Sequence, residues 1–313
     1  MIKDKIWAYF SRVKGNANKV DKNLIEHISN EIRYDTRRFL LQEHILHDNE
    51  PGVSNERYND SDIIVSLTTH GKRINDVAYT IESIMQQSFR ANRIVLWLGN
   101  EEKEKQLPRA LKLQEKRGLE IHYCEDIRAY TKLIPSLKRF PEAAIITIDD
   151  DLLYEFDLIE RLVTAYNSQP HYIHACRLHR IGLDSNNKLI PYNNWEWNIN
   201  EIGPNKYNFI TGVGGVLYPP HCFDDEIFNQ NVFMKLSRFA DDIWYTAMAI
   251  KNNTKVSKIP TRKSNGRDYL INESVQDTGL INVNTRGECL NDIQIEAVFS
   301  EYSIIEKLKN DII

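Results

Sequence analysis

Three consecutive aspartates form the most distinctive polar group in this sequence. Asp149, Asp150 and Asp151 directly follow an apolar run at 144–148, which predicts a buried strand. Adjacent carboxylates repel one another, and burying them without a cation is costly. Because alternate residues of an extended chain point the same way, we expect Asp149 and Asp151 to face one site and Asp150 to turn aside. Carboxylate oxygens suit Mg²⁺ or Mn²⁺ bridging a diphosphate, and the alternative is a solvated acidic turn or helix N-cap.

A second acidic pair, Asp241 and Asp242, opens a predicted helix over 240–251. One carboxylate at a helix start is ordinary capping, whereas two indicate either additional capping or a cap beside a catalytic base. A general base needs a carboxylate within hydrogen-bond reach of a substrate hydroxyl, and a rigid helix start positions one well.

Hydroxyl and basic side chains follow the first predicted strand, at 63–67. The segment 68–73 supplies the hydroxyls of Thr68 and Thr69 and the cations Lys72 and Arg73 around a flexible turn, where a nucleotide base or phosphate can lie. A solvated loop is the alternative interpretation.

A further polar segment follows the third predicted strand, at 119–123. Asp126 precedes Arg128, Tyr130 and Lys132, which together can bind a base and reach a diphosphate. An ordinary surface loop is the alternative for Arg128.

Two more segments are candidates for ligand contact. The glycines of 211–215 allow a backbone to approach a ligand closely, or form a bulge in a sheet. No Gly-x-Gly-x-x-Gly or P-loop motif occurs, so the dinucleotide and P-loop interpretations are weak. The irregular segment 182–208 carries aromatic residues that either stack on sugar rings or anchor the segment to the core: Tyr192, Trp195, Trp197 and Tyr207.

The elements that position these residues alternate in type from residue 62 onward. Strand-like apolar runs at 63–67, 94–98, 119–123 and 144–148 alternate with helical stripes at 77–85, 108–117 and 132–139. This order predicts an α/β fold whose parallel strands end at one ligand-binding edge. Later predicted elements are strands at 172–180 and 209–218, the helix at 240–251 and a closing helix from 291.

Composition excludes several classes of protein. The 313-residue chain has 40 Lys and Arg against 44 Asp and Glu, a net charge of −4. Without a basic excess to neutralise phosphates, we expect no nucleic-acid partner. No run approaches the roughly 18 apolar residues that span a bilayer, and the charged N-terminus is unlike a signal peptide, so we expect a cytoplasmic protein. The four dispersed cysteines fit neither a zinc framework nor a disulfide scaffold.

The sequence of the N-terminal region predicts helices without a sheet. Two sets of apolar residues at helical spacing are followed by a linker at 47–61. Basic residues surround the aromatic face of residues 1–14, which can lie on an anionic membrane surface. Packing of this face on the main domain or on a partner is the alternative.

Taken together, these motifs resemble the GT-A glycosyltransferases, specifically family-2-like bacterial enzymes. The resemblance covers about residues 62 to 260 and rests on the order of five segments: 65–69, 126–132, 148–151, 211–220 and 240–242. The phrases Val-Ser-Leu-Thr-Thr, Ile-Asp-Asp-Asp and Thr-Gly-Val-Gly-Gly-Val-Leu-Tyr-Pro-Pro are similar to a subgroup associated with capsular or other surface polysaccharide synthesis.

The resemblance implies a GT-A mixed sheet flanked by helices, with helical N- and C-terminal additions. It divides the chain into an extension and linker at 1–60, a catalytic domain at 61–262 and a C-terminal extension at 263–313. In such families an Asp-x-Asp element holds the metal and a nucleotide-sugar, here a UDP- or GDP-sugar. This role carries over to Asp149 and Asp151, with Asp150 as a further nucleotide contact.

The resemblance also implies roles in catalysis and nucleotide binding. The acidic pair before the late helix matches the catalytic base of inverting enzymes, which points to Asp242 first and Asp241 second. Asp126 and Lys132 match nucleotide-contacting positions. This chain has Ala-Asp-Asp where Gly or Thr, Glu and Asp are usual, so the choice of base between the two acids stays open. The implied acceptor is a hydroxyl of a glycan or lipid-linked sugar, at the inner face of the membrane.

Two other functions compete with this interpretation. A sugar-1-phosphate nucleotidyltransferase also uses metal-binding acids, but it usually has a glycine-rich basic loop after its first strand, and 68–73 contains one glycine. A non-catalytic carbohydrate-binding scaffold would use the aromatic residues of 182–208. It has no need of a second acidic cluster.

Overall fold

The computed structural model describes residues 2–57, 61–263, 266–278 and 290–310. Side chains are described from residue 24 onward, except in those gaps and at 26, 276–278 and 310.

An eight-stranded mixed sheet forms the centre of the molecule, in the order β3-β2-β1-β4-β10-β6-β11-β8. β1, β2, β3 and β4 run parallel, and β10 lies antiparallel between β4 and β6. Two short antiparallel pairs, β5 with β12 and β7 with β9, flank it. The strands are β1 (Ile63–Thr68), β2 (Arg93–Gly99), β3 (Leu119–Cys124), β4 (Ala144–Thr147), β5 (Leu152–Tyr154), β6 (Ile173–Ala175), β7 (Leu178–Arg180), β8 (Gly203–Asn205), β9 (Asn208–Ile210), β10 (Val216–Tyr218), β11 (Val256–Lys258) and β12 (Tyr269–Ile271).

Helices cover both faces of this sheet because its strands are apolar on both sides. In β1, Ile64 packs in one core, whereas Ile63, Val65 and Leu67 pack in the other. One core includes α2 (Val77–Met85), α3 (Arg109–Glu115) and α5 (Leu158–Ser168). The other includes α4 (Ile134–Arg139), α6 (Gln230–Leu236), α7 (Asp241–Lys251), α9 (Leu290–Glu301) and α10 (Ile304–Asn310). The predicted α/β class, a mixed sheet flanked by helices with helical additions at both ends, is confirmed.

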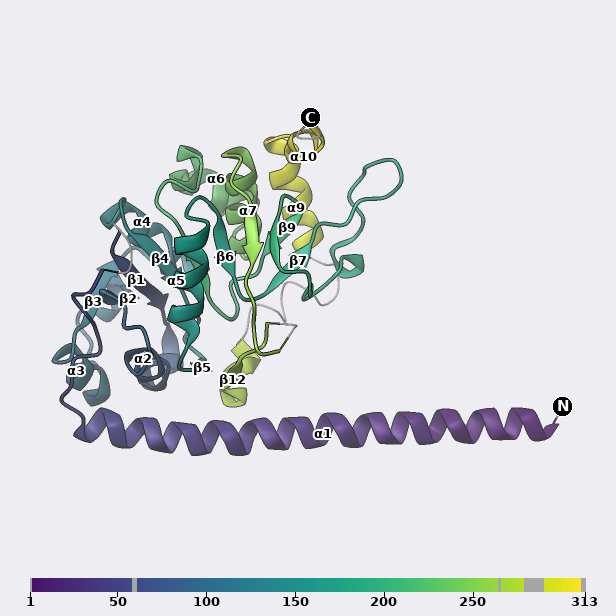
Figure 1. The fold of residues 1–313 in the computed structure, drawn as a ribbon, viewed down its shortest axis with the longest axis horizontal. Coiled ribbons are helices and arrows are strands. Elements are labelled where there is room, and N and C mark those ends of the chain that lie inside the picture. The colour runs from purple at the N-terminus through teal and green to yellow at the C-terminus, as the bar shows by residue number, and fades with distance from the viewer. Residues whose placement is uncertain (1, 58–60, 264–265, 279–289, 311–313) are drawn as a thin grey trace.

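The N-terminal region differs from its prediction in one respect. A single helix, α1 (Ile2–His47), replaces the two expected helices, and it lies along one edge of the body and extends beyond it (Figure 1). Tyr34, Leu41 and Ile45 fix it to the body, since they are 7%, 0% and 3% exposed. The basic face of residues 1–14 lies outside the described side chains. Within the described part of the chain, α1 and the other helices lack an apolar stretch long enough to cross a membrane.

Two predicted strands are each interrupted. The expected strand at 209–218 divides into β9 and β10 around 211–215, where Gly214 and Gly215 have φ values of 96° and 104°. The expected strand at 172–180 divides into β6 and β7, which belong to different sheets. Local apolar pattern predicts extended chain in both places, but the partner strands change within each run.

Candidate functional site

The site forms where β1 and β4 end side by side at the carboxyl edge of the sheet. Thr69 Oγ1 donates a hydrogen bond to Asp150 Oδ2 at 2.6 Å, and Arg73 Nη1 donates to Asp150 Oδ1 at 2.8 Å. Arg73 Nη1 also lies 3.3 Å from Asp151 Oδ2. Asp150 is thus buried and holds the turn after β1 against the end of β4. Arg73 is one of the two cations that the sequence places in the turn after the first strand, and here it contacts these two aspartates.

Asp149 contacts Lys132, whereas Asp150 and Asp151 share Arg73. The expectation that Asp149 and Asp151 face one site while Asp150 turns aside is therefore wrong for the side-chain contacts in this structure, because the chain does not alternate as a regular strand after β4.

Lys132 ends a 3-10 turn, η3 (Arg128–Lys132), and its Nζ lies 3.1 Å from Asp149 Oδ1 and 3.5 Å from Asp241 Oδ2. Burial opposes the charge of this amine, but Asp149, Asp241 and Asp242 outweigh it, so the pKa of Lys132 is raised well above its usual value. The two acidic clusters predicted separately from sequence are therefore joined by one buried cation.

Asp242 is half-buried at the start of α7, and its Oδ1 accepts a hydrogen bond from the Gly212 amide at 3.0 Å. Burial, followed by the neighbouring Asp241, raises the pKa of Asp242 from 3.8 to about 7, against the opposing effects of Lys132 and the Gly212 amide. A carboxylate with a pKa near neutrality suits proton abstraction.

Only a residue without a side chain fits at Gly212 between Lys132 and Asp242. A Cβ at this position would lie 2.8 Å from Lys132 Nζ and 3.2 Å from Asp242 Oδ1. The glycine-rich segment between the two acidic clusters thus lies close to Lys132 and Asp242, and its close approach to a ligand stays a prediction.

The donor set fits a divalent cation that a diphosphate helps to hold. Asp149 and Asp151 offer carboxylate oxygens, the ligands that Mg²⁺ prefers, and Mg²⁺ usually takes one or two carboxylates together with substrate phosphates. Among the described residues no group of three or more His, Cys, Asp or Glu side chains is placed to hold a metal. These residues therefore suit a cation shared with a bound diphosphate rather than one enclosed by protein alone.

The other candidate nucleotide contacts are distributed around this centre. Thr68 Oγ1 donates to the carbonyl of Trp97 at 3.0 Å, and Lys72 lies exposed in η1 (Gly71–Asn75). Asp126 is exposed and accepts the Arg128 amide at 2.8 Å, with Arg128 at a φ of 61°.

The expectation that Tyr130 helps to bind a base is wrong. This side chain is 0% exposed, and its hydroxyl donates to the Ser237 carbonyl at 2.8 Å, so it anchors η3 within the core. The aromatic residues of 182–208 include both buried and exposed side chains. Tyr192 and Trp195 are buried, whereas Trp197 is 38% exposed and stacks on His179 with ring centroids 5.0 Å apart.

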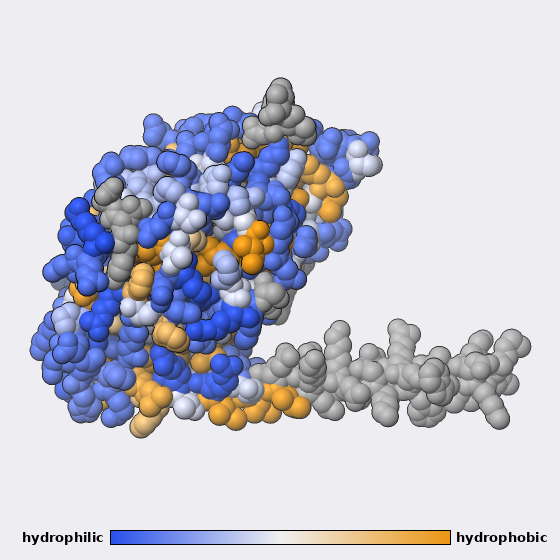
Figure 2. Space-filling model, in the orientation of Figure 1, coloured by the Kyte–Doolittle hydropathy of each residue, from blue (hydrophilic) through white to orange (hydrophobic). Residues whose placement is uncertain are grey.

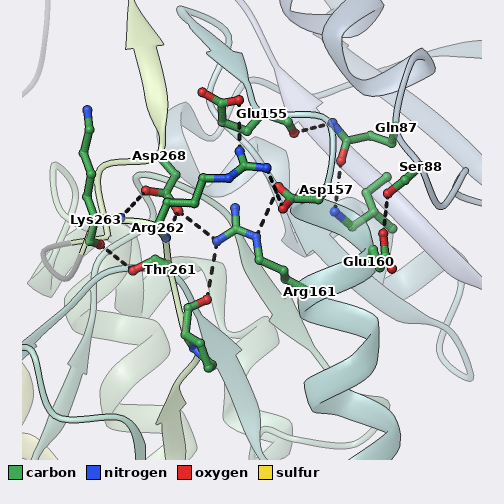
Figure 3. Close-up of polar contacts among 12 residues, drawn as sticks. Gln87, Ser88, Glu155, Asp157, Glu160, Arg161, Thr261, Arg262, Lys263 and Asp268 are labelled. Atoms are coloured by element: carbon green, nitrogen blue, oxygen red, sulfur yellow. Dashed lines mark hydrogen bonds and ion pairs between the residues drawn. The ribbon is translucent and has the colours of Figure 1, made fainter.

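A polar network holds the segment that passes next to the triple aspartate. Arg161, at the start of α5, contacts Asp157 and Asp268, and Arg262 contacts Asp157 and Glu155 (Figure 3). This network fixes residues 260–263 and Asp268 ahead of β12.

Beyond the network, the chain reaches the aspartates themselves. The Asn272 amide donates to the Asp151 carbonyl at 2.9 Å, and Arg73 Nη2 donates to the Val275 carbonyl at 3.2 Å. On the other side, the Tyr154 hydroxyl accepts the Asp149 amide at 2.9 Å. The backbone of the triple aspartate is thus held from both sides, by contacts that sequence analysis did not identify.

Comparisons with known proteins give only distant similarities. No protein-family model and no curated protein sequence matches the chain. Among solved structures, the mannosyltransferase PcManGT from Pyrobaculum calidifontis, in complex with GDP-Man and Mn²⁺, is 12% identical over 48% of this chain and 45% of that one, with a TM-score of 0.31. TarS 1–349 from S. aureus is 12% identical over 77% and 71%, with a TM-score of 0.43. UTP-bound UGPase from Acinetobacter baumannii is 9% identical over 80% and 100%, with a TM-score of 0.40. These values are too low to assign a family or an activity.

Proposed function

We propose that the chain is a metal-dependent GT-A glycosyltransferase that moves a sugar from a UDP- or GDP-sugar to a hydroxyl of a glycan or lipid-linked acceptor. One observation carries the proposal: Lys132 joins the strand-end aspartate Asp149 to the helix-start pair Asp241 and Asp242. A site with acids for a cation and a separate carboxylate of raised pKa has the two parts that direct sugar displacement needs. The resemblance of the motifs to family-2-like enzymes supports the same reaction.

The acidic residues have different roles in the proposed reaction. Asp149 and Asp151 would hold a divalent cation, which neutralises charge on the departing nucleoside diphosphate. Asp242 takes the proton of the acceptor hydroxyl while the acceptor oxygen bonds to the anomeric carbon and the bond from that carbon to the diphosphate breaks. The anomeric configuration inverts. Asp241, 6% exposed, keeps the pKa of Asp242 high by its charge, and Lys132 limits that effect.

The proposal includes the surroundings of the reaction. The catalytic part spans residues 61–262, with extensions at 1–60 and 263–313. The enzyme acts in the cytoplasm in surface polysaccharide synthesis, with residues 1–14 in peripheral contact with the inner face of the membrane.

Calorimetric titration tests the nucleotide site. UDP and GDP are each titrated with Mn²⁺ and with EDTA into the wild type and into Asp149→Ala/Asp151→Ala. We expect binding of one nucleotide that depends on metal and is lost in the double variant. The control is Asp225→Ala/Glu301→Ala, which removes two exposed carboxylates elsewhere and should bind as the wild type does. Folded wild-type protein that binds neither nucleotide, or binding that survives Asp149→Ala/Asp151→Ala, contradicts the proposal.

A further inference from the structure

Helix α1 has two apolar faces, of which only one is covered. Tyr34, Leu41 and Ile45 pack against the body, and Asn30 Nδ2 donates to the Ile271 carbonyl at 3.2 Å on the same side. Large apolar side chains that are 42% to 66% exposed occupy other positions of the helix: Leu24, Ile25, Ile28, Ile32, Phe39, Leu40 and Leu46. Figure 2 shows apolar surface gathered along this part of α1, at the lower edge of the molecule.

The exposed residues form a regular seam. Ile25, Ile32, Phe39 and Leu46 follow one another at intervals of seven, and Ile28 comes three residues after Ile25. At 100° per residue these five lie on the side opposite Leu41. Paired helices have two apolar positions in each seven residues; the residues at intervals of seven supply one of them, and Ile28 supplies the other once, followed by Asp35 and Gln42. An exposed stripe of this kind marks an interaction site, since fully burying one such side chain contributes about 1.5–3 kcal/mol.

We propose that a second copy of this chain covers the seam, with the two α1 helices paired antiparallel. This inference does not rest on the proposed function. Because the body lies on the opposite side of α1, a second helix can approach the seam without meeting it. A twofold pair buries the same surface on both copies, which is the commonest arrangement in soluble oligomers.

Charges along the seam favour the antiparallel orientation. Glu31 and Arg38 do not decide the orientation, because they share their flank of α1 with the buried Ile45, and Arg38 Cζ lies over the Tyr79 ring of the body at 5.5 Å. Asp35 lies at a seam position, and parallel pairing would place it opposite its own copy, where like charges repel.

The same residues argue against a lipid surface as the occupant. Residues 24–47 hold four acids against three arginines, so they lack the basic excess that attracts anionic lipid. The side chains of Asp35 and Glu43 are 72% and 51% exposed on or beside the seam, where they would have to enter the membrane interface.

Light scattering coupled to size-exclusion chromatography tests the pairing on the full chain. We expect the wild type to be a dimer and Ile32→Glu/Phe39→Glu to be a monomer with an unchanged circular dichroism spectrum, its dimer dissociation constant raised by about 100-fold or more. The matched control, Phe228→Glu/Ile293→Glu, changes two exposed apolar residues outside α1 and should remain a dimer. A monomeric wild type at about 100 µM, or a dimer that survives Ile32→Glu/Phe39→Glu, overturns the proposal.

Two further arms test orientation and occupant. A nitroxide label attached at Leu46→Cys, near one end of the seam, should lie far from its copy in an antiparallel dimer. Two labels side by side would contradict the antiparallel arrangement. Wild-type monomer that binds phosphatidylcholine–phosphatidylserine vesicles, with binding lost in Ile32→Glu/Phe39→Glu, would assign the seam to a membrane instead.

Discussion

At the scale of single residues, the chemistry of the site depends on how one amine is shared among several acids. Lys132 is 10% exposed in its side chain and contacts Asp149 and Asp241. The negative charge of Asp242 is compensated less directly, because its carboxylate accepts a hydrogen bond from the neutral Gly212 amide. The two neighbouring acids therefore differ in their contacts, and burial, followed by the charge of Asp241, raises the pKa of Asp242 to about 7.

The activity should rise with pH through about 7, because Asp242 must be ionised to accept a proton. We expect the pH profile of kcat/KM, measured as nucleoside diphosphate release, to show this rise in the wild type. Asp242→Asn should lower turnover by about 10²–10⁴-fold. Asp225→Asn, at an exposed position, should keep the wild-type profile. If Asp241→Asn lowers turnover by this amount and Asp242→Asn stays active, Asp241 is the catalytic base.

The same pKa makes a prediction for stability. Asp242 has a higher pKa in the folded chain than its ordinary 3.8, so its contribution to stability is present at low pH and is lost as pH rises from about 4 to about 7. Asparagine cannot ionise and can still accept the Gly212 amide. Asp242→Asn should therefore gain in melting temperature over the wild type at pH 8 but not at pH 4. A melting temperature that falls at pH 8 would contradict the burial of this charge.

Removing the shared cation should destabilise the chain. Lys132→Met leaves Asp149 and Asp241 without their buried partner, for which we expect a loss of roughly 3 kcal/mol in the free energy of unfolding at pH 8, measured by urea titration. The loss should shrink at pH 5, where Asp242 is protonated. Lys105→Met is the control, since Lys105 is 60% exposed beside Glu102 and should change stability by less than about 1 kcal/mol.

At the scale of elements, turns that bring distant segments together position the site. Thr211–Gly215 joins β9 to β10 and carries Gly212 to Asp242. Gly266, between β11 and β12, lies against the chain between β6 and β7. A Cβ on Gly266 would lie 2.1 Å from the Cys176 carbonyl oxygen, and its φ is 77°. Only glycine satisfies both conditions.

Gly266→Ala should therefore destabilise the chain well beyond the cost of a positive φ. Gly71 is the matched control, because its φ is 57° but nothing lies within 4 Å of an added Cβ. We expect Gly71→Ala to cost about 1–2 kcal/mol and Gly266→Ala to cost about 1–3 kcal/mol more, both measured by chemical denaturation. Equal costs would show that the segment shifts freely away from Cys176.

The pattern of apolar residues located most helices and strands, because burial of one face or both faces of an element makes apolar residues recur at a fixed spacing. The strands at 63–67 and 94–98 are apolar on both faces, and the strand at 119–123 is apolar on one face; all three appear where the pattern predicted them. Division of 172–180 between β6 and β7 was not predictable, since local pattern does not specify which strand pairs with which.

At the scale of the whole molecule, α1 is unusual because it is held at one end and extends beyond the body at the other (Figure 1). Its described half carries the apolar seam, and the sequence of its first 14 residues carries Lys3, Lys5, Arg12 and Lys14. The two segments have different chemistry and separate tests.

Vesicle sedimentation tests the proposed membrane contact of residues 1–14. Deletion of these residues should reduce co-sedimentation with anionic vesicles, because it removes the basic residues that attract the lipid surface. The deletion leaves Ile25 to Leu46 in place, so the oligomeric state should not change. Unchanged co-sedimentation would exclude this segment as the contact.

The sequence by itself determined the strand–helix alternation, the acidic clusters at a strand end and a helix start, and the glycine-rich segment between them. These are local features, set by periodicity and by repulsion among adjacent charges. Only the tertiary structure decided that Asp150 is buried against Thr69 and Arg73, that Tyr130 anchors the core, and that one lysine joins Asp149 to Asp241. Such contacts join residues up to 109 positions apart, and their geometry depends on strand order and chain reversal, which local pattern does not encode.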